Sequence, residues 1–178
     1  MERWINSEVV YRGPIVSLRK GEAELDDGTR VHREVVEHAG GVAVLPELSD
    51  GRIVLVRQYR IAVQQDLLEI PAGRLESGET PAERAACELE EEVGYRAGRL
   101  ELLSECLPSP GFTDQKDYIY LATDLTKTAQ NLEFDERIEV VTMPLDEAWA
   151  MVSRGELQDA KTLIAVYALM ALRQPLAR

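Results

Sequence analysis

The first part of the chain alternates between apolar runs and turn-forming residues, which is typical of β-strands. Two runs of roughly alternating polarity flank Asp27-Gly28 and predict an antiparallel hairpin. Residues 41–46 (GVAVLP) and 52–59 (RIVLVRQY) flank a second turn, at Asp50-Gly51, and predict another hairpin. Both of these later strands are continuously apolar, so we expect them to be buried on two faces.

A helix is predicted from Pro81 to near Gly94. Thr80 and Glu83 form a capping-box pattern around a proline at the first helical position, and Gly94 is a suitable C-terminal cap. Helical spacing predicts that the core-facing side consists of Ala82, Ala86, Leu89 and Val93.

The second half of the chain alternates between further strands and helices. The predicted strands are residues 100–107, 117–125 and 138–143, and the predicted helices are 145–154 and 161–173. A polar loop, 108–116 (PSPGFTDQK), separates the first two of these strands. The pattern indicates a mixed sheet with helices, in the α/β (α+β) class, and the length favours one domain with a small N-terminal extension.

Charge and composition limit the partners that we expect. The formal net charge of −12 argues against nucleic acid and against an anionic membrane surface. The two cysteines, Cys87 and Cys106, have no metal-like spacing and fit a reducing compartment without disulfides. The N-terminus has no signal-peptide pattern, and the longest apolar run, 163–172, is too short to cross a bilayer. We therefore expect a soluble, cytoplasmic protein.

Residues 87–94, CELEEEVG, place like charges three and four positions apart on the predicted helix, where they repel each other. At about 100° per residue, Glu88, Glu91 and Glu92 share one sector, whereas Glu90 points toward solvent. Hard divalent cations such as Mg²⁺ take oxygen ligands and bridge carboxylates to phosphates, which would explain the cluster. A solvated acidic helix face explains this segment alone equally well.

The spacing around the cluster resembles the Nudix box, in which glycine, five residues, glutamate and seven residues precede Arg-Glu-apolar-x-Glu-Glu-x-Gly-apolar. The positions in register are Gly73, Glu79, Glu88, Leu89, Glu91, Glu92, Gly94 and Tyr95. The resemblance implies an α/β/α sandwich and hydrolysis of a nucleoside diphosphate linked to another moiety. It also implies that Glu88 and Glu92 are the principal metal ligands. Glu91 would be a further ligand or base, and Glu79 would support the site from the loop.

One position departs from the motif, because Cys87 stands where the family has an arginine that holds the loop and the glutamates in place. Arg84 lies four residues before Glu88 on the same helix face. Our hypothesis is that Arg84 supplies the missing guanidinium. The alternative is that Arg84 is an exposed residue that contributes only to solubility. The intact glutamates argue against complete loss of the site.

The resemblance extends over most of the chain and is greatest to the ADP-ribose pyrophosphatase branch of the family. Such enzymes split ADP-ribose into AMP and ribose 5-phosphate. The segments that carry this resemblance are HREVVEHAGGVAVLP, VRQYR, LLEIPAG, SPGFTDQK and IEVVTMPLDEA. It implies that Arg33 and Arg60 contact substrate, although either could be a surface strand residue. It also implies that the carbonyl of Ala72 is a metal ligand.

Many branch members carry a catalytic glutamate on a mobile loop before the strand that begins at Ile138. Here the loop offers Glu133, Asp135 and Glu136, and Glu136 fits the family register best. A solvated acidic loop is the alternative for each of them. Gln115 stands where the family often has glutamate, so it could bind substrate through hydrogen bonds but cannot ionise.

Branch members commonly form homodimers through their N-terminal strands. The resemblance therefore implies an N-terminal antiparallel β extension at 1–38 that contributes to a homodimer, and a Nudix hydrolase domain at 39–178. The expected activity is Mg²⁺-dependent cleavage of ADP-ribose or a related nucleoside diphosphate sugar, with Mn²⁺ as a possible substitute. The alternatives are another nucleoside diphosphate derivative as substrate, such as a GDP-sugar, a UDP-sugar or a dinucleotide, and a non-catalytic nucleotide-binding domain.

Overall fold

The computed structural model describes residues 1–134 and 136–173, and the chain divides into two compact units. We call Met1–Gly40 together with Leu107–Lys116 the N-terminal unit, and Gly41–Cys106 together with Asp117–Arg178 the main unit. The N-terminal strands thus associate with a loop from the second half of the chain. The backbone N–H of Val36 donates to the carbonyl of Phe112 at 2.7 Å, which connects the two segments.

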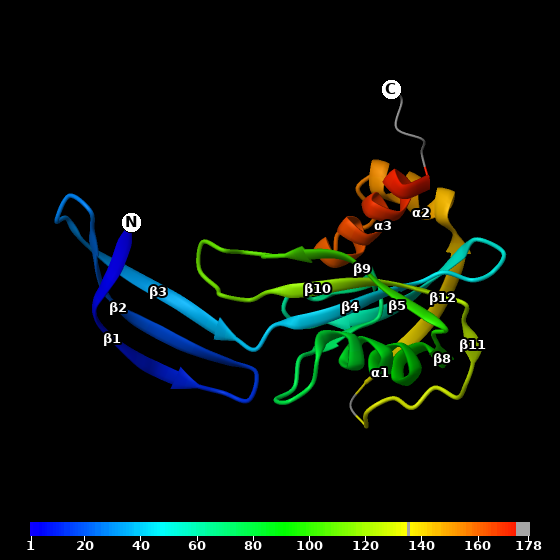
Figure 1. Cartoon of the computed structure of the whole chain (residues 1–178), viewed down its shortest axis with the longest axis horizontal. Helices are drawn as coiled ribbons and strands as arrows, with labels where there is room; N and C mark the ends of the chain where they lie inside the picture. Colours follow the sequence, from blue (N-terminus) through cyan, green and yellow to red (C-terminus); the bar gives the residue numbers. More distant parts are fainter. Residues whose placement is uncertain (135, 174–178) are drawn as a thin grey trace. The chain divides into compact units, whose positions relative to one another are not determined.

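The N-terminal unit contains a three-stranded antiparallel sheet, in the order β1-β2-β3, drawn in blue in Figure 1. Its strands are β1 (Glu2–Arg12), β2 (Val16–Leu25) and β3 (Arg30–His38). The predicted hairpin around Asp27-Gly28 is confirmed as the connection between β2 and β3. Gly28 has a φ of 84°, and the Asp27 carboxylate accepts a bond from the N–H of Thr29 at 2.9 Å, as expected for an Asx-type turn.

In the described part of the main unit there are two larger sheets and one short two-stranded sheet. In the four-stranded sheet the order is β7-β4-β10-β9, with β4 and β10 parallel and the other pairs antiparallel. The three-stranded sheet has the order β12-β5-β6, and β11 pairs with β8. The strands are β4 (Gly41–Pro46), β5 (Arg52–Arg60), β6 (Gln65–Glu69), β7 (Ala72–Arg74), β8 (Tyr95–Arg96), β9 (Arg99–Cys106), β10 (Asp117–Thr123), β11 (Thr126–Lys127) and β12 (Ile138–Pro144).

The expected hairpin between residues 41–46 and 52–59 is wrong, because β4 and β5 lie in different sheets. Close to the turn, an isolated bridge pairs Glu47 with Ile53, and the N–H of Leu48 donates to the carbonyl of Arg52 at 2.8 Å. Beyond the turn, β4 pairs with β7 and β10, whereas β5 pairs with β6 and β12. A continuously apolar strand has no polar face that would fix its partner, so the sequence pattern could not distinguish these arrangements.

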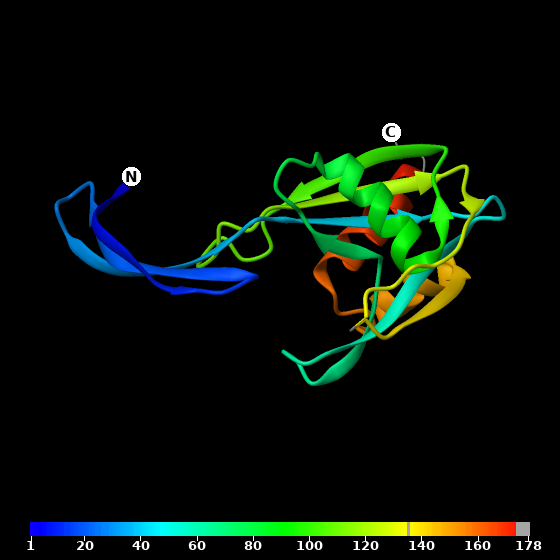
Figure 2. The same ribbon diagram turned by 90° about the horizontal axis from the view of Figure 1, so that it is seen from below.

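Helices cover the sheets of the main unit on opposite sides, as Figures 1 and 2 show. They are α1 (Pro81–Val93), α2 (Leu145–Ser153) and α3 (Ala160–Arg173). Ala43 and Leu45 of β4 pack in one hydrophobic cluster with α2 and α3, while Val42 and Val44 pack in a second cluster with α1. This alternation confirms both the burial of β4 on two faces and the expected α/β/α sandwich. Within the described residues, every helix is too short or too polar to cross a bilayer.

The capping box predicted at the start of α1 is present, because Thr80 and Glu83 exchange hydrogen bonds between side chain and backbone. The predicted core-facing side of this helix is partly wrong. Leu89 and Val93 are buried, but Ala82 and Ala86 are exposed, and the buried set is Ala85, Glu88, Leu89, Glu92 and Val93. The inner face of α1 therefore includes two glutamates, which a pattern based on apolar residues assigns to a different side.

Candidate active site

Two glutamates of α1 are buried against β7. Glu88 is 4% exposed and Glu92 is 3% exposed. A Cβ atom at position 73 would lie 1.5 Å from Oε1 of Glu88, so that the carboxylate fits only because Gly73 has no side chain. Oε2 of Glu92 accepts a hydrogen bond from the N–H of Ala72 at 3.1 Å. The short strand that precedes the loop of the motif thus fixes both carboxylates.

Burial makes both of these carboxyl groups reluctant to ionise. It raises the pKa of Glu88 to about 7, although the neighbouring Arg84 opposes the shift. It raises the pKa of Glu92 to about 8, with a further contribution from the charge of Glu88. The charge of Glu136 raises the pKa of both glutamates as well. An added cation would relieve this accumulation of negative charge.

Arg84 lies between the glutamates at the surface of this site. Its guanidinium forms an ion pair with Oε1 of Glu88, and its Nη2 lies 3.5 Å from Oε2 of Glu91. The Arg84 side chain is 14% exposed, whereas that of Glu91 is 39% exposed. Burial lowers the pKa of Arg84, but the charges of Glu88 and Glu91 outweigh it and raise the pKa, with the smallest contribution from Glu79, which is exposed. The structure therefore brings Arg84 together with the predicted ligands Glu88 and Glu91.

The donors in this site have the chemistry that a hard divalent cation requires. Carboxylate oxygens come from Glu88, Glu91 and Glu92, and Ala72 adds a backbone carbonyl on the neighbouring strand. Among the residues that the structure describes, no three His, Cys, Asp or Glu side chains converge as a ready-made metal site. The donor types fit the cation, and Arg84 occupies the position beside two of them.

A small cavity of about 160 Å³ opens beside Glu88, one of the two buried glutamates. Glu136, which the sequence predicts as a catalytic residue, lines this cavity. The full set of lining residues is Ala72, Gly73, Arg74, Glu76, Arg84, Glu88, Glu133 and Glu136. The structure therefore places an acid of the later loop next to the acids of the helix.

Hydrogen bonds to the end of α1 hold this later loop in place. The N–H groups of Thr128 and Asn131 donate to the carbonyls of Gly94 and Glu91 at 2.7 and 2.9 Å. The Nε2 atom of Gln130 donates to the carbonyl of Glu92 at 2.6 Å. The loop thus satisfies carbonyls that every helix leaves unpaired at its C-terminus. Further on, Oε2 of Glu136 accepts a bond from the N–H of Glu133 at 2.9 Å. Asp135 lies outside the described residues.

Arg60, a predicted substrate-binding residue, is oriented by a buried carboxylate. Its Nε and Nη2 atoms each donate to Glu69 at 2.8 Å, in a two-pronged pair. Glu69 is 2% exposed, whereas the Arg60 side chain is 38% exposed. The pKa of Arg60 is raised mainly by Glu69, with a smaller contribution from Glu92. Arg60 therefore lies within electrostatic reach of the buried glutamates, with its guanidinium fixed in one orientation.

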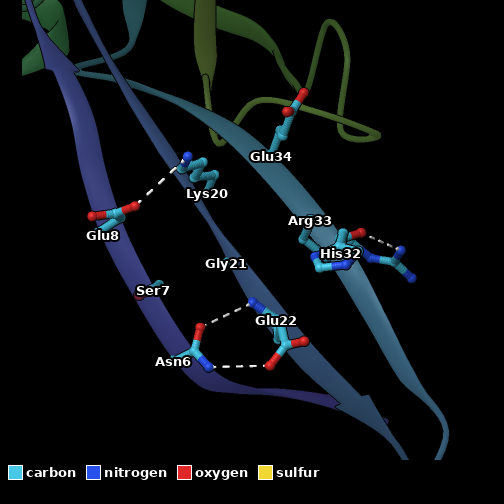
Figure 3. Close-up of a pocket in the computed structure, with 9 residues that line it drawn as sticks. All are labelled: Asn6, Ser7, Glu8, Lys20, Gly21, Glu22, His32, Arg33 and Glu34. Carbon is cyan, nitrogen blue, oxygen red and sulfur yellow. Dashed lines mark hydrogen bonds and ion pairs between the residues drawn. The ribbon is translucent and has the colours of Figure 1, made fainter.

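The other two predicted substrate-binding residues, Arg33 and Gln115, belong to the N-terminal unit. Arg33 lies on β3 and forms a two-pronged pair with Glu2 of β1, at 2.8 and 2.9 Å. It also lines a hollow of about 540 Å³ on the three-stranded sheet, shown in Figure 3. The backbone N–H of Gln115 donates to Oγ1 of Thr113 at 3.1 Å.

Sequence reasoning missed three residues at the site. Arg74 and Glu76 line the cavity beside Glu88. Their signal was their position, because both lie between the first glycine and first glutamate of the motif. Gln130, which fixes the later loop, had no sequence signal, because its role depends on a helix carbonyl more than 30 residues away.

Comparison with known proteins agrees with this arrangement. The sequence model of the NUDIX domain matches residues 37–166. A methanol dehydrogenase activator of Bacillus methanolicus is 40% identical over 167 residues, covering 93% of this chain and 90% of that protein. An ADP-ribose pyrophosphatase of Bacillus subtilis is 38% identical over 167 residues, again covering 93% of this chain and 90% of that protein. One of Mycobacterium tuberculosis is 37% identical over 171 residues, covering 94% of this chain and 83% of that protein.

A solved structure of an ADP compounds hydrolase superposes with a TM-score of 0.84 at 24% identity, covering 96% of this chain and 93% of that one. At this identity the likeness concerns the fold, and it confirms the expected sandwich. The family resemblance is confirmed by the domain match and by the relatives. Nudix hydrolases generally need a divalent metal, in keeping with the oxygen donors at α1. This chain belongs to the Nudix family.

Proposed function

We propose that this protein is a Mg²⁺-dependent pyrophosphohydrolase that cleaves ADP-ribose, or a related nucleoside diphosphate sugar, at its diphosphate. With ADP-ribose the products are AMP and ribose 5-phosphate. The observation that carries the proposal is the pair of buried glutamates, Glu88 and Glu92, held against Gly73 and Ala72 beside a cavity lined by acids. Identity of 37% and 38% to two ADP-ribose pyrophosphatases supports this choice of substrate.

The metal would be held by the carboxylates of Glu88, Glu91 and Glu92 and by the carbonyl of Ala72, with Mn²⁺ as a substitute for Mg²⁺. When bound, a divalent cation neutralises the diphosphate and lowers the pKa of the attacking water. Both buried glutamates must lose their protons to serve as ligands, so binding of the metal releases protons near neutral pH.

Other side chains would bind the substrate and move the proton of the attacking water. Arg60 pairs with Glu69 through Nε and Nη2, and the other N–H groups of its guanidinium would donate to phosphate oxygens. Glu136, on the loop held by Gln130, accepts the proton of the attacking water, and Glu91 is the second candidate for this role. Arg33 and Gln115, both in the N-terminal unit, are the other two proposed substrate-binding residues. Glu79 supports the site through its charge on Arg84.

We further propose a homodimer that forms through the N-terminal unit, whose residues 1–38 serve as an extension of the hydrolase domain 39–178. Apolar side chains remain exposed on and beside β1, as expected for a surface that a second copy covers. They are Trp4, Ile5, Val10, Tyr11 and Ile15. The net charge of −12 supports a protein that binds neither nucleic acid nor membranes. The two free cysteines support a location in the reducing cytoplasm.

The test is a panel of ADP-ribose, a GDP-sugar, a UDP-sugar and a dinucleotide, each incubated with Mg²⁺ or with a chelator. We expect AMP from ADP-ribose with Mg²⁺, and none with the chelator or with the Glu92→Gln variant. Faster cleavage of another compound would show that this compound, and not ADP-ribose, is the preferred substrate. Nucleotide binding without turnover of any compound would show a non-catalytic domain.

A further inference from the structure

The Nudix box of this chain has no arginine at its usual place, which Cys87 occupies. Arg84 lies three residues earlier on α1, and residues three or four apart share one side of a helix. Arg84 precedes Glu88 by one turn, just as position 87 precedes Glu91 by one turn. An arginine at either position can therefore reach this group of carboxylates.

We propose that Arg84 replaces the missing motif arginine and is the positioning residue that holds Glu88 and Glu91 ready for the divalent cation. This inference rests on the proposed metal-dependent function, but it concerns how the ligands are arranged before the cation binds. Arg84 itself contacts neither the substrate nor the reacting atoms in this account.

The contacts of Arg84 support this role. One guanidinium nitrogen, Nη2, pairs with Glu88 and lies 3.5 Å from Oε2 of Glu91. The guanidinium of Arg84 thus orients both glutamate side chains. Because Glu88 is 4% exposed and Gly73 closes one side of it, Arg84 limits the remaining freedom of the carboxylate.

The burial of Arg84 argues against the alternative that this residue contributes only to solubility. Its side chain is 14% exposed, and its buried Nε atom has no hydrogen-bond partner within the described residues. Burying an unsatisfied donor costs free energy, so a purely structural arginine would gain little here. By contrast, Arg96 pairs with Glu90 near the end of the same helix while remaining 69% exposed, as an ordinary surface pair does.

The test measures Mn²⁺ binding by electron paramagnetic resonance, without substrate, on the full-length protein. The variants are Arg84→Gln, Arg84→Gln combined with Cys87→Arg, and Arg96→Gln as the matched control. We expect Arg84→Gln to weaken Mn²⁺ binding by about tenfold to a hundredfold, the effect typical of residues that orient metal ligands. Arg96→Gln should bind as the wild type does, and Cys87→Arg should restore most of the affinity that Arg84→Gln loses.

Activity gives a second readout, because a positioning defect can be overcome by metal. The Arg84→Gln variant should regain most of its ADP-ribose cleavage as the Mg²⁺ concentration rises, and its KM for ADP-ribose at saturating Mg²⁺ should match the wild type. Thermal unfolding checks that the Arg84→Gln variant folds. If it does not fold, the same measurements are made on Arg84→Lys, which keeps the charge but not the planar guanidinium.

Mn²⁺ affinity of Arg84→Gln equal to or above that of the wild type would overturn the proposal. So would a loss of affinity that Cys87→Arg fails to restore, or a loss of activity that excess Mg²⁺ leaves unchanged. If the wild type binds Mn²⁺ but cleaves no ADP-ribose, the proposed function fails while the role of Arg84 is still decided by the binding data.

Discussion

Gly73 shows why one residue of the motif must be glycine. The Glu88 carboxylate occupies the space in which a side chain at position 73 would begin. The motif fixes the distance between the two residues in the sequence, but only the packing of β7 against α1 shows that they touch. Residue types at this site thus follow from contacts between elements, and not from local backbone conformation.

The Gly73→Ala variant tests this contact directly. A Cβ atom 1.5 Å from Oε1 of Glu88 forces the carboxylate out of its place, so we expect strongly reduced Mn²⁺ affinity and a lower melting temperature. The matched control is Gly111→Ala, because, apart from the glycine and its two chain neighbours, no atom of the described residues lies within 4 Å of the corresponding Cβ position. Wild-type Mn²⁺ affinity in Gly73→Ala would show that Glu88 is not held in this way.

The raised pKa of Glu92 predicts how stability changes with pH in metal-free protein. Its pKa is about 8 in the folded state, against 4.5 for an ordinary glutamate, so between these values the folded state binds more protons than the unfolded state. The free energy of unfolding therefore falls as pH rises through this window, by at most about 1.4 kcal/mol per pH unit from this group.

Glu92→Gln isolates this effect, because glutamine cannot ionise and can still accept the bond from Ala72. Urea denaturation at several pH values should show the variant gaining stability relative to the wild type between about pH 5 and 8, and no further gain above. A constant difference across this range would mean that Glu92 ionises at its ordinary pKa when folded.

At the scale of elements, the loop after β11 depends on α1 for its position. Backbone N–H groups of Thr128 and Asn131 and the side chain of Gln130 bond to carbonyls at the end of the helix. The same helix carries Glu88, Glu91 and Glu92, so one element positions both the proposed metal ligands and the loop that carries Glu136. Damage to this connection should therefore affect catalysis more than metal binding.

Gln130→Ala removes the only one of these three bonds that a side chain makes. We expect a reduced kcat for ADP-ribose with unchanged Mn²⁺ affinity, because Glu136 is no longer held beside the cavity. Asn131→Ala is the matched control, since the Asn131 bond to Glu91 comes from the backbone and survives the substitution. Equal kcat values for the two variants would argue against a positioning role of Gln130.

At the scale of the whole molecule, the sequence predicted the elements better than their partners. The capping box and Gly94 determined the ends of α1, because local hydrogen bonds and a φ of 68° fix them. The partners of β4 and β5 could not be predicted, because apolar strands buried on both faces do not specify register. The motif pointed to Glu88 and Glu92, but both are buried because this face of α1 packs against the rest of the main unit, which local sequence patterns do not predict.

The proposed homodimer is also a property of the whole molecule. The mass of one chain is 19.9 kDa, so sedimentation equilibrium should give a molar mass about twice this value at micromolar concentration. A Trp4→Asp variant, which places a charge among the exposed apolar residues of β1, should shift the protein toward monomer. A wild-type protein that sediments as a monomer throughout would contradict the dimer.

The central claim is that Glu88, Glu91 and Glu92 hold a divalent cation against the diphosphate of the substrate. A crystal structure with Mg²⁺ and a non-hydrolysable α,β-methylene analogue of ADP-ribose tests it most directly. We predict Mg²⁺ bound by these carboxylates and by the carbonyl of Ala72, at about 2.0–2.1 Å, and in contact with the phosphonate oxygens. An analogue bound elsewhere, with no cation at these side chains, would contradict the account.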